Sequence, residues 1–225
     1  MSAPTRDEHA LREAIVATGR EMNALGINRG KSGNVSARWR EGTFDGYLIT
    51  PSGMPYVSIG PADVVAMPSE GGTDAVRGGR RPSSEWRFHR DIYRVRDDAE
   101  AIVHTHSPFA TSIACLRLAI PAFHYMIAVA GGDDIRCALY ATFGTQALSD
   151  HAVEALEGRR ACLLANHGMI AIGASLEAAL ALAVEVETLA EMYWRARQLG
   201  EPHLLSGAEM ETVIAKFRTY GQPRS

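Results

Sequence analysis

The sequence is short of lysine, of paired cysteines and of long apolar runs, and each shortage excludes a class of protein. Lysine occurs only at Lys31 and Lys216, against 21 arginines. Lys31 lies in a Gly/Ser-rich stretch and Lys216 in a terminal helical pattern, so neither has the apolar surroundings that activate a lysine amine. Covalent catalysis through a lysine imine is therefore disfavoured.

The three cysteines, Cys115, Cys137 and Cys162, form no CxxC pair and stand among apolar residues. This is typical of buried, reduced thiols and favours a cytoplasmic protein. No apolar run is long enough to cross a bilayer, and the charged residues within 1–16 argue against a secretory signal. The net charge of −3 gives no general attraction to nucleic acid or anionic membrane. We expect neither as a partner.

The hydrophobic pattern predicts helices and strands in irregular alternation. Helical spacing covers 7–25, 83–95, 107–117, 145–158, 175–200 and 206–221, with Ser83 and Ser84 as N-cap of the second helix and a Ser206/Glu209 capping box on the last. Strand patterns cover 34–39, 46–50, 63–67, 101–106, 122–132, 135–140 and, as a hairpin turning at 166–168, 160–173.

This alternation, in a chain of 225 residues, predicts a single three-layer α/β domain over 1–225. The Gly- and Arg-rich segment 68–82 has no visible period, which predicts a mobile surface loop. Residues 222–225 are expected to fray.

Two histidines, His104 and His106, stand at the end of a short apolar strand. Side chains at i and i+2 of a strand lie on one face, so both imidazoles point the same way and can share a divalent metal. An isolated pair of this kind is more often one core histidine and one surface histidine. A metal site therefore needs further ligands elsewhere in the chain.

His167, in a tight turn beside glycine, and Glu85, at the opening of a helix, are the candidates for those ligands. Each has a plainer alternative: an ordinary turn for His167, and for Glu85 either favourable interaction with the helix dipole or pairing with His89 one helical turn on. Three imidazoles and one carboxylate would make a zinc site with a displaceable ligand, as catalysis requires.

Three loops, at 32–36, 50–53 and 82–84, offer backbone N–H groups with hydroxyl or amide side chains, as anion-binding loops do. Each signal is weak taken singly. No GxxxxGK[ST] motif occurs, so nucleotide binding gains little support.

Taken together, the segments resemble the class II aldolase/adducin family, most closely its members that cleave L-fuculose 1-phosphate. The matching segments, in order from near residue 20 to near residue 221, are GNVSAR, LITPSGMPY, PSSEWRFH, VHTHS, PAFHYMIAVAGG, YATFGT, LLANHG and KFRTYG. The resemblance implies an α/β/α sandwich around a mixed, largely antiparallel sheet, assembled as a homotetramer with sites between subunits.

The resemblance also implies a role for individual residues. The metal ligands would be Glu85, His104, His106 and His167, holding one Zn²⁺ per subunit, with Mn²⁺ or Co²⁺ as substitutes. Glu85 would leave the metal and act as base, and Tyr125 of a neighbouring subunit would act as acid. Gly33, Asn34, Ser52, Gly53, Ser83 and Ser84 would bind phosphate, and Phe143 and Tyr220 would line the aldehyde position.

The implied reaction is reversible cleavage of a ketose 1-phosphate, such as L-fuculose 1-phosphate or a related 5- or 6-deoxyketose 1-phosphate, to dihydroxyacetone phosphate and an aldehyde. Metal stabilisation of the enediolate needs no imine, which agrees with the scarcity of lysine. Alternatives within the family are a pentulose-phosphate 4-epimerase, a methylthioribulose-phosphate dehydratase and a sugar-acid phosphate decarboxylase. A non-enzymatic adducin-like module is disfavoured by the complete set of ligands.

Overall fold

The centre of the molecule is a seven-stranded sheet, seen in a computed structural model that describes residues 7–77 and 79–217. The strands are β1 (Asn34–Glu41), β2 (Phe44–Ile49), β3 (Val65–Pro68), β4 (Ala101–Thr105), β5 (Cys137–Ala138), β6 (Ala161–Leu164) and β7 (Gly168–Gly173). Their order across the sheet is β3-β2-β1-β4-β7-β6-β5. Neighbours are antiparallel except β5 and β6, which are parallel, so the sheet is mixed and largely antiparallel.

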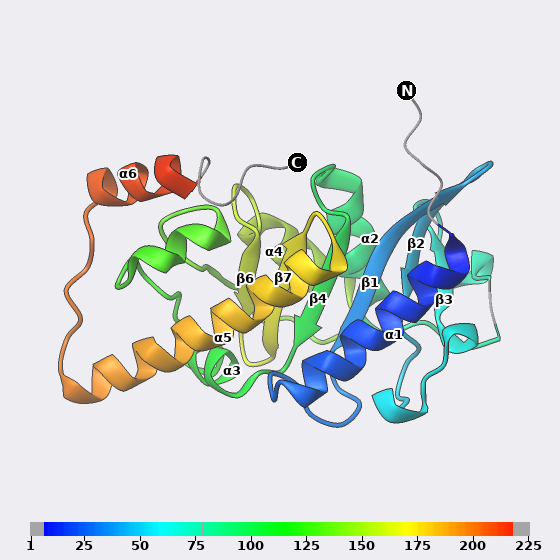
Figure 1. Ribbon diagram of the computed structural model, residues 1–225, viewed down its shortest axis with the longest axis horizontal. Helices are drawn as coiled ribbons and strands as arrows, with labels where there is room; N and C mark the ends of the chain where they lie inside the picture. Colours follow the sequence, from blue (N-terminus) through cyan, green and yellow to red (C-terminus); the bar gives the residue numbers. More distant parts are fainter. Residues whose placement is uncertain (1–6, 78, 218–225) are drawn as a thin grey trace.

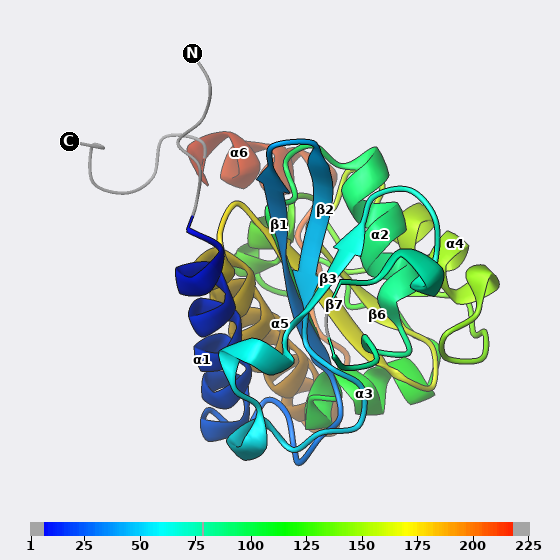
Figure 2. The same cartoon turned by 90° about the vertical axis from the view of Figure 1, so that its right-hand side faces the viewer.

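Helices cover both faces of this sheet (Figures 1 and 2). They are α1 (Glu8–Ala24), α2 (Trp86–Val95), α3 (Pro108–Cys115), α4 (Gln146–Ala155), α5 (Leu176–Leu199) and α6 (Gly207–Phe217). One apolar core lies between the sheet and α1, α3 and α5, and a second lies between the sheet and α2 and α4. Alternation along β4 feeds both cores, since Val103 joins the first and Ile102 the second. The predicted three-layer α/β/α architecture is confirmed.

Most helix ends follow from local chemistry. The Thr145 side chain accepts a hydrogen bond from the N–H of Leu148 at the start of α4, and Ser175 does the same for Ala178 at the start of α5. The Ser206/Glu209 capping box forms as predicted ahead of α6. A polar residue therefore marks the start of these helices in the sequence, whereas α2 and α3 begin without a side-chain cap.

Three local predictions are wrong. Residues 122–132 are not a strand, because Tyr125–Ala130 form a 3₁₀ helix that ends at Gly131 in the left-handed conformation. Of 135–140, only Cys137–Ala138 pair as a strand. The second helix begins at Trp86, with Glu85 rather than Ser83 or Ser84 at the N-cap.

The segment 68–82 is held at both ends by backbone pairing. Ala66 and Arg77 form an antiparallel bridge, and Pro51 pairs with Pro82. A short 3₁₀ turn at Thr73–Ala75 lies just before Arg77 in the chain. The predicted frayed tail at 222–225 lies outside the described residues. No helix within 7–217 has the length and apolar character that a membrane crossing demands.

Candidate active site

The structure brings Glu85, His104, His106 and His167 together, with one potential ligand atom from each within 4.8 Å of all the others. The Nε2 atom of His104 lies 3.1 Å from Glu85 Oε2, and Nε2 of His167 lies 3.1 Å from Glu85 Oε1. The Nε2 atoms of His104 and His106 are also 3.1 Å apart. Edges of this length fit a tetrahedron around an ion with bonds of about 2.0–2.1 Å.

The end of β4 supplies two of these residues. His104 lies in the strand, fully buried, and His106 follows directly after it, on the same side of the chain, as alternation predicts. The Nδ1 atom of His104 lies 2.8 Å from the Met169 carbonyl oxygen on β7. Because a carbonyl only accepts, Nδ1 carries a proton, so Nε2 of the ring in its neutral form turns a lone pair toward the cluster.

His167 reaches the cluster from the turn between β6 and β7. Its N–H donates to the Leu164 carbonyl at 3.0 Å, and Asn166 takes a positive φ of 54° to close the turn. A side chain at Gly168 would run into the backbone oxygen of Thr105 and lie 3.1 Å from the His106 ring. Glycine is therefore required where the turn passes over the end of β4.

The surroundings of Glu85 keep its carboxyl group ionised. Burial opposes the charge, but the charges and hydrogen bonds of His104 and His167 hold the pKa of Glu85 well below its ordinary value. Burial also opposes a charge on His104, yet the Glu85 carboxylate raises the pKa of that imidazole. Burial, together with the neighbouring His104 and His167, lowers the pKa of His106 to about 4. The cluster thus concentrates one negative charge among imidazoles.

These donors fit a divalent metal ion. The bare Nε2 of His104 faces the Glu85 carboxylate, an arrangement that needs either a proton or a cation between the two acceptors. Glu85 Oε1 is also buried, and it faces Nε2 of His167 at 3.1 Å in the same way. Imidazole nitrogens and carboxylate oxygens are ligand types that zinc binds in catalytic sites.

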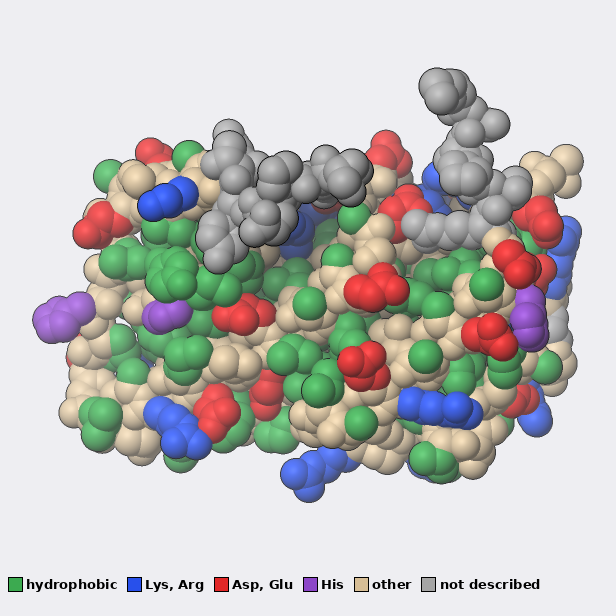
Figure 3. Space-filling view, in the orientation of Figure 1, with side chains coloured by type: hydrophobic (Ala, Val, Ile, Leu, Met, Phe, Trp, Pro, Cys, Tyr) green, Lys and Arg blue, Asp and Glu red, His purple; other side chains and the backbone are tan. Residues whose placement is uncertain are grey.

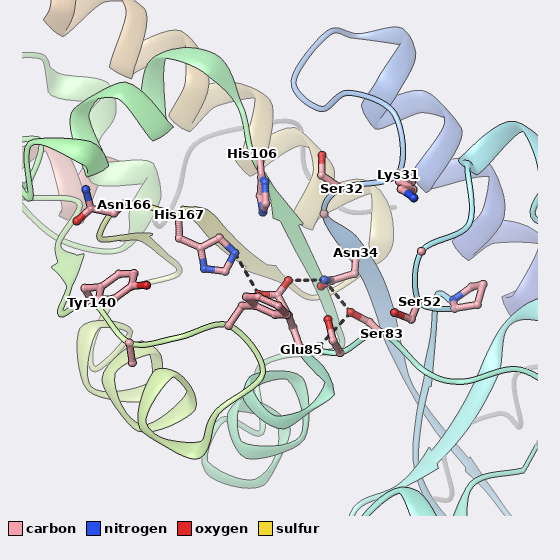
Figure 4. A pocket seen from close by; sticks show the side chains of 16 residues that line it. Lys31, Ser32, Asn34, Ser52, Ser83, Glu85, His106, Tyr140, Asn166 and His167 are labelled. Carbon is pink, nitrogen blue, oxygen red and sulfur yellow. Dashed lines mark hydrogen bonds and ion pairs between the residues drawn. The ribbon is translucent and has the colours of Figure 1, made fainter.

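A pocket of about 470 Å³ opens beside the cluster (Figure 4). Its walls include all six residues of the expected phosphate site, namely Gly33, Asn34, Ser52, Gly53, Ser83 and Ser84. Two of the three loops are bonded to each other, because Ser52 N–H donates to the Arg81 carbonyl and Ser83 N–H to the Thr50 carbonyl. The third follows a glycine turn at Gly33, where a side chain would strike the backbone of His104.

Among the residues that line the pocket, sequence reasoning did not assign Lys31, Tyr140 and Asn166 to it. Lys31 brings a positive charge to the rim formed by the Ser/Gly loops (Figure 4). Its position directly before the first of those loops, in the same Gly/Ser-rich stretch, could have indicated this place. The Asn166 amide accepts from Arg117 and donates to the Cys115 carbonyl, so it ties the His167 turn to the end of α3.

Of the residues expected near the aldehyde, one lines the pocket and another lies outside it. Phe143 lines the pocket. Tyr125, about half exposed, lies instead beside Met126 and Phe217, outside the walls of this pocket as the described residues define them. Tyr220 lies outside the described residues. Glu85 forms no pair with His89 within 7–217; both side chains contact Asn34 instead.

The sequence matches the family model for the class II aldolase and adducin N-terminal domain over residues 13–194. The chain belongs to the class II aldolase and adducin family. It is 56% identical over 212 residues to a 5-methylthioribulose-1-phosphate/5-deoxyribulose-1-phosphate aldolase of Rhodospirillum rubrum, covering 94% of this chain and 93% of that one. It is 46% identical over 216 residues to an L-fuculose phosphate aldolase of Escherichia coli, covering 96% and 97%.

A solved structure of an L-fuculose 1-phosphate aldolase superposes on this class II aldolase with a TM-score of 0.86 at 41% identity, covering 97% of this chain and 98% of that one. The expected family and fold are therefore confirmed. Since these relatives are named aldolases, the chain is an enzyme of the lyase class. Its cluster of histidines and glutamate is able to bind a metal ion.

Proposed function

We propose that this enzyme is a zinc-dependent aldolase that reversibly cleaves a ketose 1-phosphate to dihydroxyacetone phosphate and an aldehyde. The supporting observation is one pocket bordered on one side by the Glu85 cluster and on the other by three Ser/Gly loops and Lys31. The relatives named for 5-deoxyribulose 1-phosphate and L-fuculose phosphate favour a 5- or 6-deoxyketose 1-phosphate as substrate.

The metal would be held by His104, His106, His167 and, before substrate binds, Glu85. When bound there, zinc supplies Lewis acidity that stabilises negative charge on the ketone oxygen. Imidazole donors suit zinc well, and Mn²⁺ or Co²⁺ could use the same ligands. No lysine amine is needed, in agreement with the composition.

The phosphate would lie among the loops. The Ser83 Oγ accepts from Asn34 Nδ2 at 3.0 Å and from the N–H of Glu85 at 3.3 Å, so its own O–H can donate to a phosphate oxygen. Ser52, Gly53, Ser84 and Gly33 add hydroxyl and backbone N–H donors, and Lys31 adds charge. This anchoring would set the reacting carbons against Glu85.

Glu85 would accept and return the proton of the reaction, since it borders both the metal position and the pocket. We further propose a homotetramer in which Tyr125 of a neighbouring subunit supplies the acid. Tyr125 is half exposed and outside its own chain's pocket, which suits a role across an interface. Phe143 would line the aldehyde, and Tyr220 is proposed for the same position on the resemblance alone.

A panel of ketose 1-phosphates, with released dihydroxyacetone phosphate trapped enzymatically, tests the reaction. We expect deoxyketose 1-phosphates to be cleaved with kcat/KM above the other members of the panel. Glu85→Gln keeps size and polarity but removes the base, so turnover should fall at least about 1000-fold while zinc remains bound.

Glu13→Gln on the exposed face of α1 is the matched control and should leave kcat unchanged. Near-normal activity of Glu85→Gln would show that another group is the base. Formation of a C4 epimer without cleavage would replace the aldolase proposal by an epimerase.

A further inference from the structure

Behind Glu85, a row of buried polar side chains leads into the core between the sheet and α2. Asn34 Nδ2 lies 2.9 Å from Glu85 Oε2, and Asn34 Oδ1 is hydrogen bonded to His89 Nε2. Nδ1 of His89 lies 2.7 Å from Ser36 Oγ, which lies 2.8 Å from the Tyr93 hydroxyl. The four side chains behind Glu85, namely Asn34, His89, Ser36 and Tyr93, are all buried.

The direction of every hydrogen bond in this row follows from Glu85. A carboxylate only accepts, so the Asn34 amide must turn its NH₂ toward Glu85 and its oxygen toward His89. That oxygen needs a donor, so His89 carries its proton on Nε2 and accepts at Nδ1. Ser36 therefore donates to His89 and accepts from Tyr93. Each proton in the row points toward Glu85.

The sheet fixes the inner end of this row against the metal ligands. Asn34 on β1 stands opposite His104 on β4 in the antiparallel register. One rung of the sheet thus carries both a ligand and the residue that holds the Glu85 carboxylate. The Nδ2 atom of Asn34 also donates to Ser83, so both N–H groups of its amide are used.

The two oxygens of Glu85 are consequently unequal. Each oxygen faces the Nε2 atom of a candidate ligand at 3.1 Å, Oε2 that of His104 and Oε1 that of His167, but only Oε2 also accepts from the Asn34 amide. A glutamate has several rotatable bonds, and holding one oxygen removes most of that freedom. The held oxygen orients the group, and the other oxygen is left for the metal or for a substrate proton.

We propose that Asn34 and His89 are positioning residues that orient the Glu85 carboxylate, with His89 in its neutral Nε2–H form. The inference rests on the proposed role of Glu85 as the base. Ser36 and Tyr93 act one step further away by fixing which nitrogen of His89 carries the proton. Burial, and then the nearby His104, lower the pKa of His89 to about 3, which agrees with a neutral ring.

His89→Leu tests the proposal, because His89 is buried and lies outside the pocket walls. Loss of its N–H should lower kcat by about 10- to 100-fold, the usual range for residues behind a metal site. KM and zinc content should change less than about threefold, because the phosphate loops and ligands remain. His89→Gln retains an N–H near the Nε2 position and should restore most of the lost kcat.

Tyr47→Phe is the matched control. Tyr47 is buried in the same core, and its hydroxyl donates to the Trp86 carbonyl rather than to the row. It should cost stability without lowering kcat. If His89→Leu fails to fold, Ser36→Ala takes its place, with a kcat loss at the lower end of the same range. A loss no larger than that of Tyr47→Phe would overturn the proposal.

Nitrogen-15 NMR of histidine-labelled protein gives a readout that needs no activity. His89, assigned by its absence from the spectrum of His89→Gln, should show the neutral Nε2–H tautomer; an Nδ1–H or doubly protonated ring would overturn the proposal. Its failure is separable from that of the proposed function. If Glu85→Gln is active, the proposed role of Glu85 as the base is refuted. If Glu85→Gln is inactive while His89→Leu is fully active, only the positioning role of His89 is refuted.

Discussion

At the scale of the residue, His104 is oriented by contacts at both of its ring nitrogens. The Met169 carbonyl takes the Nδ1 proton, and the Glu85 carboxylate faces Nε2. The first contact fixes the tautomer that leaves a lone pair for a cation. The second places an anionic ligand where that cation would be shared. Backbone pairing between β4 and β7 therefore sets the chemistry of the site as well as its position.

A pH prediction follows from His89. Its unfolded imidazole has the ordinary pKa of 6.5, and burial followed by the nearby His104 lowers this pKa to about 3 in the folded protein, against the raising effect of Glu85. Between these values the unfolded chain binds more protons than the folded one. The contribution of the neutral His89 to folding stability is therefore fully present above pH 6.5, and it is lost as the pH falls toward 3.

Thermal unfolding of metal-free protein, followed by circular dichroism from pH 7 to pH 4, measures this decline. The melting temperature of the wild type should fall more steeply than that of His89→Gln, since glutamine does not titrate. Parallel curves for the two proteins would mean that His89 contributes nothing to the pH dependence.

At the scale of the element, α3 links two parts of the site. It begins just after His106, and its last turn accepts bonds from Asn166, next to His167. Its first turn is capped from another helix, since the buried Glu187 carboxylate of α5 accepts the N–H groups of Phe109 and Ala110, each at 2.8 Å. A carboxylate at a helix N-terminus is stabilising on both hydrogen-bonding and dipole grounds.

Glu187→Ala should therefore lower the free energy of unfolding by about 2–3 kcal/mol, because it leaves buried N–H groups without an acceptor. Glu187→Gln keeps an acceptor oxygen and should cost less. Denaturant unfolding monitored by fluorescence gives both values.

Glu191→Ala, one turn further along α5, removes a partly exposed ion pair with Arg195 but no N-terminal cap, and serves as control. Its loss should stay below about 1 kcal/mol. Equal losses for Glu187→Ala and Glu191→Ala would show that the cap contributes little.

Elements with a strong period could be predicted from the sequence, and contacts between distant elements could not. The helix expected at 7–25 forms as Glu8–Ala24, and the hairpin at 160–173 forms as β6 and β7. The prediction of a strand at 122–132 is wrong because the apolar run there carries no period that separates a strand from a short helix. In the structure, the His124 side chain accepts from the Met126 N–H and starts a 3₁₀ turn there.

The site shows the same division. The pair His104 and His106 could be assigned to one face from strand alternation alone. The bond from Asn34 to Glu85 joins residues 51 positions apart, so no local pattern contains it. The sequence therefore indicated which residues could serve as ligands, whereas the groups that orient them emerged from the packing of β1 against α2.

At the scale of the whole molecule, large apolar side chains are exposed both at the pocket, where Tyr140 and Phe143 lie, and away from it. Figure 3 shows apolar groups gathered below α6 on the face that carries α5. Tyr125, Met192 and Trp194 are among the large apolar side chains that are substantially exposed in the single chain. Such surface is typical of a protein that associates with copies of itself, as the proposed homotetramer requires.

Subunit mixing tests whether Tyr125 acts across an interface. Tyr125→Phe and Glu85→Gln should each have little activity as pure proteins. When the two are co-expressed in equal amounts, about a quarter of the sites would combine a native Glu85 with a native Tyr125 from the neighbour, so activity should return to that extent.

Wild-type protein mixed with each variant separately controls for subunit dilution. Activity that stays at the level of the separate variants would place Tyr125 outside the neighbouring site.

The row of hydrogen bonds behind Glu85 also has a consequence for the whole catalytic cycle. A proton wire conducts only if its last member can take a proton from the group it serves. Here Asn34, His89, Ser36 and Tyr93 all donate toward the carboxylate, so the row is polarised against outward transport. A proton captured by Glu85 would therefore have no exit through the core. It would return to the pocket, where the bound product or solvent receives it.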